Sequence, residues 1–202
     1  ELSYAGFSVL QEETLVPVFR AGIPVNIKNT NNPSAPGTMI VTTRDASKNP
    51  VSGIASDKGF CSIYVSKYLM NREIGFGRKL LEILEDEGLS YEHTPSGIDN
   101  ISVILREKQL TPETEERVLN RIKIELDVDD ISIEYNLTLV IIVGEGMRNT
   151  VGTAAKATGA LAKAGVSLEM INQGSSEISM MFGVKSADAD AAIKALYHEF
   201  FK

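Results

Sequence analysis

Apolar and polar residues follow two different periods along the chain, and these periods predict strands that alternate with helices. Residues 61–65 alternate with Cys61, Ile63 and Val65 on one side, which is typical of a half-buried strand. The residues after this strand have the 3.6-residue spacing of an amphipathic helix, which Gly88 is expected to end. The apolar face of this helix consists of Phe76, Leu80, Ile83 and Leu84.

The pattern continues to residue 135. We expect strands near 89–94 and 100–106, separated by a turn at Pro95-Ser96-Gly97. Thr111-Pro112-Glu113 has the composition of a helix start, with a Thr cap, Pro in the first position and an early acid. That helix continues through Val118, Ile122 and Leu126, and residues 130–135 form a closing strand. The order is therefore βαββαβ.

The rest of the chain gives the same order without its last strand. We predict a strand at 137–143, a helix at 151–164 and strands at 166–171 and 177–184. A final helix is predicted at 187–200, with Ser186 as its cap. Its apolar stripe consists of Ile193, Leu196, Tyr197 and Phe200.

An internal repeat supports this division. Gly88-Leu89-Ser90-Tyr91-Glu92 matches Gly165-Val166-Ser167-Leu168-Glu169 with an offset of 77 residues. The same offset relates Ile101-Ser102 to Ile178-Ser179, Gly75 to Gly152 and Met70 to Met147. A constant offset at several places indicates a duplicated unit.

The second unit lacks a strand, and a missing strand would leave an exposed sheet edge. Residues 51–56 are extended and precede the first unit, so we expect them to fill the gap. The predicted fold is α+β, with two compact ferredoxin-like βαββαβ sheets, each with helices on one face, and with the first unit inserted within the second. The first domain would span 60–135, and the second 51–56 plus 136–202.

Residues 1–37 match neither unit. Leu2–Arg20 has the pattern of an amphipathic helix, Ile23–Lys28 that of a short strand, and Asn29–Gly37 that of a loop. Because the chain starts at Glu1 inside a predicted helix, we interpret this stretch as the end of another domain and the chain as part of a longer protein.

Charge and composition exclude several classes of function. The formal net charge of −7 argues against a surface for nucleic acid or anionic membranes. No run of about 18 apolar residues could span a membrane. The single cysteine, Cys61, lies in an apolar run and is expected to be a buried thiol in a reducing cytoplasm.

The sequence contains no recognisable catalytic or metal-binding constellation. His93 and His198 lie far apart in the pattern, without a partner at metal-ligand spacing. The run 144–149 approaches a dinucleotide fingerprint but has Asn149 in place of the third glycine. The run 75–79 lacks the spacing of a phosphate-binding loop. We expect no catalytic residue, no metal and no cofactor.

Binding is more plausible than catalysis. Gly75 and Gly152 stand at equivalent strand-to-helix turns, where unsatisfied backbone N–H groups suit a carboxylate. A glycine that only permits the turn is the alternative. Glu92 and Glu169 recur at one repeat position, on the strand expected beside that helix start, and could accept an ammonium group. The polar runs 96–100 and 172–177 would complete a small pocket for a zwitterion.

Three segments resemble one family. The run Met170–Ser179 resembles the signature of the second ACT module of aspartate kinases, and Glu92–Asp99 is similar to the corresponding part of the first module. Residues 1–7, 24–27 and 37–38 look like the end of the family's amino-acid-kinase domain. The resemblance extends over essentially the whole chain, and the family interlaces its two ACT modules as predicted above.

The resemblance implies a parent enzyme that uses MgATP to phosphorylate the side-chain carboxylate of L-aspartate, the first step towards lysine, threonine and methionine. The family's catalytic motifs would lie upstream of Glu1, so this chain alone should be inactive. Its implied role is feedback inhibition by lysine, threonine or both, in a homodimer or a larger homo-oligomer. The family often has Asp where Glu92 stands and a shorter turn than residues 94–98, which leaves the effector open.

Family positions carried over give an effector site and a second group of residues that would form either a second site or the dimer interface. The effector site would consist of Met70, Glu73, Gly75, Phe76, Gly77, Tyr91, Glu92, Asp99 and Asn100. The second group consists of Asn149, Gly152, Asn172, Gln173 and Glu177. A dimerisation scaffold without effector binding, or a separate regulatory subunit, remains the alternative.

Overall fold

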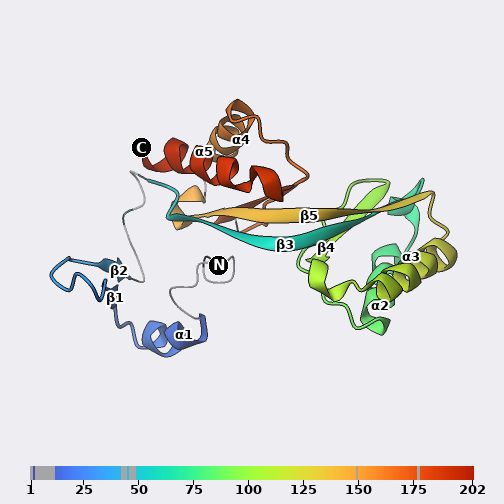
Figure 1. Cartoon of the computed structure of the whole chain (residues 1–202), viewed down its shortest axis with the longest axis horizontal. Coiled ribbons are helices and arrows are strands. Elements are labelled where there is room, and N and C mark those ends of the chain that lie inside the picture. Colours follow the sequence, from blue (N-terminus) through green and yellow to red (C-terminus); the bar gives the residue numbers. More distant parts are fainter. Residues whose placement is uncertain (1, 3–11, 42–44, 46–48, 149, 177) are drawn as a thin grey trace.

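The computed structural model describes residues 2, 12–41, 45, 49–148, 150–176 and 178–202. Its main feature is a five-stranded antiparallel sheet with the strand order β4-β3-β5-β7-β6. The strands are β3 (Gly53–Ser66), β4 (Asn100–Arg106), β5 (Asp130–Val143), β6 (Met170–Asn172) and β7 (Ser179–Lys185). Figure 1 shows β3 and β5 as a long two-stranded ribbon that runs through the molecule.

The two sheets expected from the sequence are joined into one, because β3 and β5 are each 14 residues long and cross both units. Residues 53–58 pair with 138–143, and residues 62–66 pair with 130–134. Between these stretches the register shifts around Phe60, next to Gly59 at φ 84° and opposite Asn136 at φ 59°. A β-bulge of this kind bends and twists a strand without ending it.

Two helices pack against each half of the ribbon (Figure 1). They are α2 (Phe76–Asp86) and α3 (Pro112–Leu126) for the first unit, and α4 (Thr153–Lys163) and α5 (Ala189–Phe201) for the second. Single-turn 3₁₀ helices span Met70–Arg72, Glu107–Gln109, Glu145–Met147 and Ser186–Asp188.

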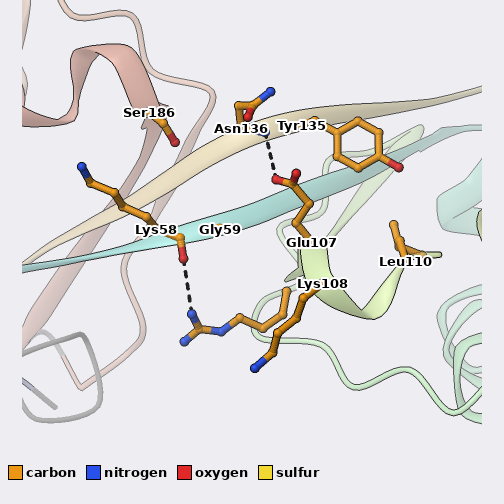
Figure 2. A pocket seen from close by; sticks show the side chains of 9 residues that line it. Lys58, Gly59, Glu107, Lys108, Leu110, Tyr135, Asn136 and Ser186 are labelled. Atoms are coloured by element: carbon orange, nitrogen blue, oxygen red, sulfur yellow. Dashed lines mark hydrogen bonds between the residues drawn. The ribbon is translucent and has the colours of Figure 1, made fainter. Parts of the chain in front are cut away.

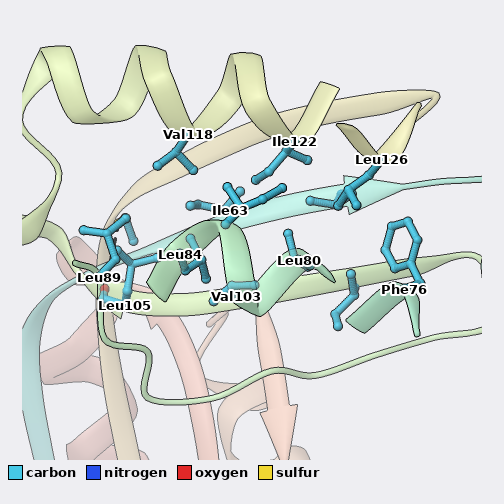
Figure 3. Close-up of a cluster of buried hydrophobic side chains, with 14 of the residues drawn as sticks. Ile63, Phe76, Leu80, Leu84, Leu89, Val103, Leu105, Val118, Ile122 and Leu126 are labelled. Carbon is cyan, nitrogen blue, oxygen red and sulfur yellow. Dashed lines mark hydrogen bonds between the residues drawn. The ribbon is translucent and has the colours of Figure 1, made fainter. Parts of the chain in front are cut away.

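Each unit has its own core, as the predicted apolar faces required. The first core joins alternate residues of β3 to α2 and α3, and Figure 3 shows Ile63 between Leu80 and Ile122. The second core joins Val140 and Ile142 of β5 to α4 and α5. A third cluster, which includes Phe60, Leu139 and Met181, lies on the opposite sheet face, since its β5 residues alternate with those of the second core.

Several predicted caps are present. The Thr114 N–H donates to Thr111 Oγ1 over 3.3 Å, and Pro112 is the first residue of α3. Gly88 adopts φ 70° after α2, and the Leu89 N–H donates to the Leu84 carbonyl over 2.8 Å, as in a Schellman motif. The prediction for Ser186 is wrong. It starts a 3₁₀ turn and its hydroxyl bonds Thr138 Oγ1 over 2.8 Å, whereas the residue before α5 is Asp188.

Two predicted strands differ. Residues 89–94 form no continuous strand, and only isolated bridges join His93 to Ile104 and Ser96 to Ile101. The strand predicted at 166–171 is shortened to β6, because the Glu169 N–H is the first to bond β7, through the Gly183 carbonyl. Both segments lie at sheet edges, where pairing is available on one side only.

The N-terminal segment matches neither unit in the structure either. Its described part holds α1 (Glu12–Arg20) and a small hairpin of β1 (Val25–Ile27) and β2 (Thr38–Ile40). The strand at 38–40 was not predicted. Of the predicted helix Leu2–Arg20, residues 12–20 are helical, Leu2 lies in a turn, and residues 3–11 lie outside the described residues.

Candidate functional site

The strand-to-helix turns of the two units have the same geometry. Gly75 precedes α2 with φ 82°, and Gly152 precedes α4 with φ 89°, a backbone conformation that only glycine adopts without strain. Neither helix start has a side-chain cap. A Cβ placed at Gly75, Gly77 or Gly152 would meet nothing within 4 Å. Each turn therefore presents backbone N–H groups to open space, which favours an anion such as a carboxylate.

Some of the other residues predicted around the first turn already contact groups of the protein. Met70 and Phe76 are buried in the first core. The Glu73 carboxylate lies 2.9 Å from both Lys79 Nζ and Lys67 Nζ. The hydrogen bond from Lys79, and then that from Lys67, holds the Glu73 pKa below its usual value. Ion pairs of Glu73 and the burial of Met70 and Phe76 thus both stabilise the turn.

Glu92 does not lie beside the start of α2. Its carboxylate faces Arg106 of β4, with Oε1 3.3 Å from Arg106 Nε, while Asp57 Oδ2 lies 2.5 Å from Arg106 Nη2. Glu92 lines a small cavity with Phe60 and Met181 of the third cluster, on the sheet face opposite α2. Tyr91 next to it is 47% exposed. The structure therefore separates the predicted acid from the predicted carboxylate site within one chain.

The next two predicted residues, Asp99 and Asn100, lie at the start of β4. The Asp99 carbonyl accepts from the Lys67 N–H over 2.9 Å and from Ser66 Oγ over 3.3 Å. Asp99 Oδ1 is buried and has no hydrogen-bond partner among the described residues. Asn100 lines a cavity of about 520 Å³. Asp99 and Asn100 are thus near Lys67, which also bonds Glu73.

The second predicted group is only partly described. Gly152 stands at the start of α4, and Gln173 is exposed. Asn172 Nδ2 lies 3.3 Å from His93 Nδ1, which links the end of β6 to the first unit. Asn149 and Glu177 lie outside the described residues.

His93 is the functional candidate that the sequence left unassigned. Burial lowers its pKa, with a smaller opposing effect from the Glu92 carboxylate. Its Nε2 is buried without a described partner, and the residue lines a cavity of about 20 Å³. A cavity of that size can hold one water molecule. The repeat comparison could not reveal this contact, since His93 and Asn172 occupy different positions of their units.

Two larger hollows lie along the ribbon. One of about 580 Å³ lies at the bulge, and its lining includes Lys58, Glu107 and Asn136. Figure 2 shows the Glu107 carboxylate directed toward Asn136. Glu107 accepts the Asn136 N–H there over 3.3 Å, which fixes the bulge. The cavity of about 520 Å³ lies on the outer face of β3, β4 and β5. The alternating polar residues of these strands were the only sequence signal for it.

In the part of the chain that the structure describes, no group of three or more His, Cys, Asp or Glu side chains is placed to hold a metal ion. The helices of that part are also too short or too polar to cross a membrane. Cys61 is buried in the first core, and burial raises its pKa to about 12.

Comparisons with known proteins place this chain beside the aspartokinases. The family model for the ACT domain matches residues 140–200. Aspartokinase 3 of Bacillus subtilis is 62% identical over 201 residues, covering all of this chain and 44% of that protein. The crystal structure of the Clostridium acetobutylicum aspartate kinase superposes with a TM-score of 0.88 at 44% identity, covering 98% of this chain and 45% of the other.

A more distant structure shares the fold. Aspartokinase III of E. coli, crystallised with lysine and aspartate in its T-state, gives a TM-score of 0.73 at 21% identity, over 96% of this chain and 42% of the other. The chain spans less than half the length of each of these three proteins.

Proposed function

Because the chain is related over its whole length to the C-terminal, ACT-domain part of the aspartokinases, we propose that it senses an amino acid and regulates an aspartate kinase. The parent enzyme would transfer a phosphoryl group from MgATP to the side-chain carboxylate of L-aspartate. This region would bind an end product, lysine or threonine, and favour the less active state. The observation that carries the proposal is the 62% identity along 201 residues.

The geometry of the turns supports amino-acid binding. An amino acid carries a carboxylate, and the uncapped starts of α2 and α4 offer free N–H groups to it. Lysine is favoured as the effector by its presence in the related E. coli enzyme. For inhibition, the effector must bind one state of the enzyme more tightly than the other, typically by about 1–3 kcal/mol.

A homodimer would complete the site. Within one chain Glu92 lies away from the start of α2. The acidic side chain that pairs with the ammonium group of the ligand would therefore come from elsewhere. A second copy is the natural source, since closed two-fold assemblies are the commonest.

With a single, buried cysteine, the chain suits the reducing cytoplasm.

Calorimetric titration tests this proposal. The chain would be titrated with L-lysine, L-threonine and L-methionine, singly and in pairs. Gly77→Gln adds a side chain at the start of α2, and Gly159→Gln adds the same side chain at an equally open helical position in α4. We expect saturable binding of one amino acid that Gly77→Gln weakens at least about tenfold, or about 1.4 kcal/mol, and Gly159→Gln leaves unchanged.

The second candidate function is a dimerisation scaffold, and one observation favours it. Ile74 and Val151 occupy equivalent repeat positions before the two turn glycines and are 96% and 99% exposed. Exposed apolar side chains at repeated positions suit contact with another protein surface. A chain that dimerises in sedimentation but takes up none of the three amino acids would support the scaffold instead.

A further inference from the structure

The outer sheet face of the first unit is polar where a packed sheet face would be apolar. Tyr64 of β3 pairs with Ser102 of β4 and with Ser132 of β5, so these three side chains form one row across the sheet. Ser62 forms the next row with Ile104 and Glu134. These residues alternate with Cys61, Ile63 and Val65, which face the core below α2 and α3.

The two rows form the floor of the cavity of about 520 Å³. Its walls come from both units. One wall is the turn 95–97, held by bonds of 2.9 Å from the Ser102 N–H to the Pro95 carbonyl and 2.8 Å from the Gly97 N–H to the Asn100 carbonyl. The other wall is 169–171, whose Glu169 N–H donates to the Gly183 carbonyl over 2.9 Å. The cavity is therefore preformed, and its size is in the usual range for small-molecule sites, about 300–1,000 Å³.

The hydroxyl groups on the floor are available to a ligand. Within the described ranges, no side-chain hydroxyl of Ser62, Tyr64, Ser102 or Ser132 bonds another group of the protein. A hydroxyl can donate one hydrogen bond and accept others. The far end is apolar, with Ile104, Leu137 and Met170 all buried.

The charged groups of the cavity are carboxylates. Glu134 and Glu169 line it, and Lys185 forms an ion pair with Glu134. The hydrogen bond to Glu134 is the main cause of the raised Lys185 pKa, and the Glu169 charge contributes less. Glu169 makes no ion pair of its own among the described residues. One lysine therefore faces two carboxylates, which leaves a net negative charge beside the free hydroxyls.

We propose that this cavity is a second ligand site, formed within one chain, for a small molecule that carries a primary ammonium group on a short, partly apolar chain. The ammonium has three donors, which match the Glu169 carboxylate and the serine hydroxyls. Its apolar chain lies against Ile104, Leu137 and Met170. The site is separate from the start of α2, and the proposal does not rest on the regulatory role.

Titration of the whole chain with n-pentylammonium chloride, followed by calorimetry and by amide chemical shifts, tests this site. The neutral 1-pentanol is the matched probe without charge. We expect saturable one-to-one binding of the ammonium, shifts at 95–97 and 169–171, and weaker binding of the alcohol. Glu169→Gln should weaken ammonium binding about fivefold, as for a partly exposed charge contact. Ser132→Ala should weaken it by a smaller factor.

Glu199→Gln is the control, because Glu199 is an exposed acid on α5 whose change alters the net charge equally. Equal weakening by Glu169→Gln and Glu199→Gln would mean bulk attraction only and would overturn the proposal. Equal binding of the alcohol and the ammonium would also overturn it. So would a second copy of the chain that covers residues 95–97 and 169–171 at all protein concentrations. Gly77→Gln should leave this binding intact, so failure here and failure of the effector site are distinguishable.

Discussion

The ion pair between Glu92 and Arg106 is expected to stabilise the fold measurably, and Glu92→Gln is the perturbation that tests it. The two charged atoms lie 3.3 Å apart, and the side chains are 16% and 28% exposed. At an effective dielectric constant of about 20, the direct attraction is about 5 kcal/mol. Desolvation of both groups offsets most of it, which leaves a net contribution of about 1 kcal/mol.

The other contacts of Arg106 limit the loss of stability in Glu92→Gln. Asp57 still pairs with the guanidinium at 2.5 Å after Glu92→Gln, and the Phe60 ring lies 4.1 Å from it. No unpaired buried cation is therefore created. Arg106→Met removes the partner of both acids, so we expect it to cost about 2 kcal/mol, more than Glu92→Gln.

Urea unfolding of both single variants and of the double variant gives the coupling energy between Glu92 and Arg106, which we expect to be about 1 kcal/mol. Glu116→Gln, at an exposed acid of α3, is the charge-matched control and should change stability by less than about 0.5 kcal/mol. Additive effects at Glu92 and Arg106, within about 0.3 kcal/mol, would refute the reasoning.

Three further predictions concern buried groups. Leu80→Ala removes a fully buried side chain of the first core and should lower the free energy of unfolding by about 3 kcal/mol in urea titrations, whereas a loss below about 1 kcal/mol would contradict the packing. Because burial lowers the His93 pKa, the folded chain binds this proton less readily than the unfolded chain. The contribution of His93 to stability is therefore complete above about pH 6.5 and is lost as the pH falls towards its lowered pKa. The free energy of unfolding should change by at most about 1.4 kcal/mol per pH unit. His93→Gln should therefore flatten the pH dependence of unfolding between about pH 7.5 and 5.5, and an unchanged pH dependence would contradict the burial of this side chain. Because burial raises the Cys61 pKa to about 12, the thiol should react with a disulfide reagent at pH 8 only after unfolding, and rapid labelling of the native chain would show the first core to be open.

The periodic patterns of the sequence determined the local elements. Helices α2 to α5 and strands β4 and β7 lie where the apolar spacing predicted them, because one face of each is buried in a core. Caps that depend only on neighbouring residues, such as Thr111 and Gly88, were also predictable. The repeat offset located Gly75 and Gly152, whose conformations agree.

Contacts between residues far apart in sequence were decided only by the tertiary structure. The sequence placed Glu92 near the start of α2, but its carboxylate lies with Arg106 and Asp57 on the other sheet face. The link between His93 and Asn172, and the cavity above Tyr64, likewise depend on how the two units meet. Periodicity specifies which side of an element is buried, because burial follows side-chain direction along that element. It does not specify the partner of a polar group, since the charge, distance and desolvation that select this partner exist only once the chain has folded.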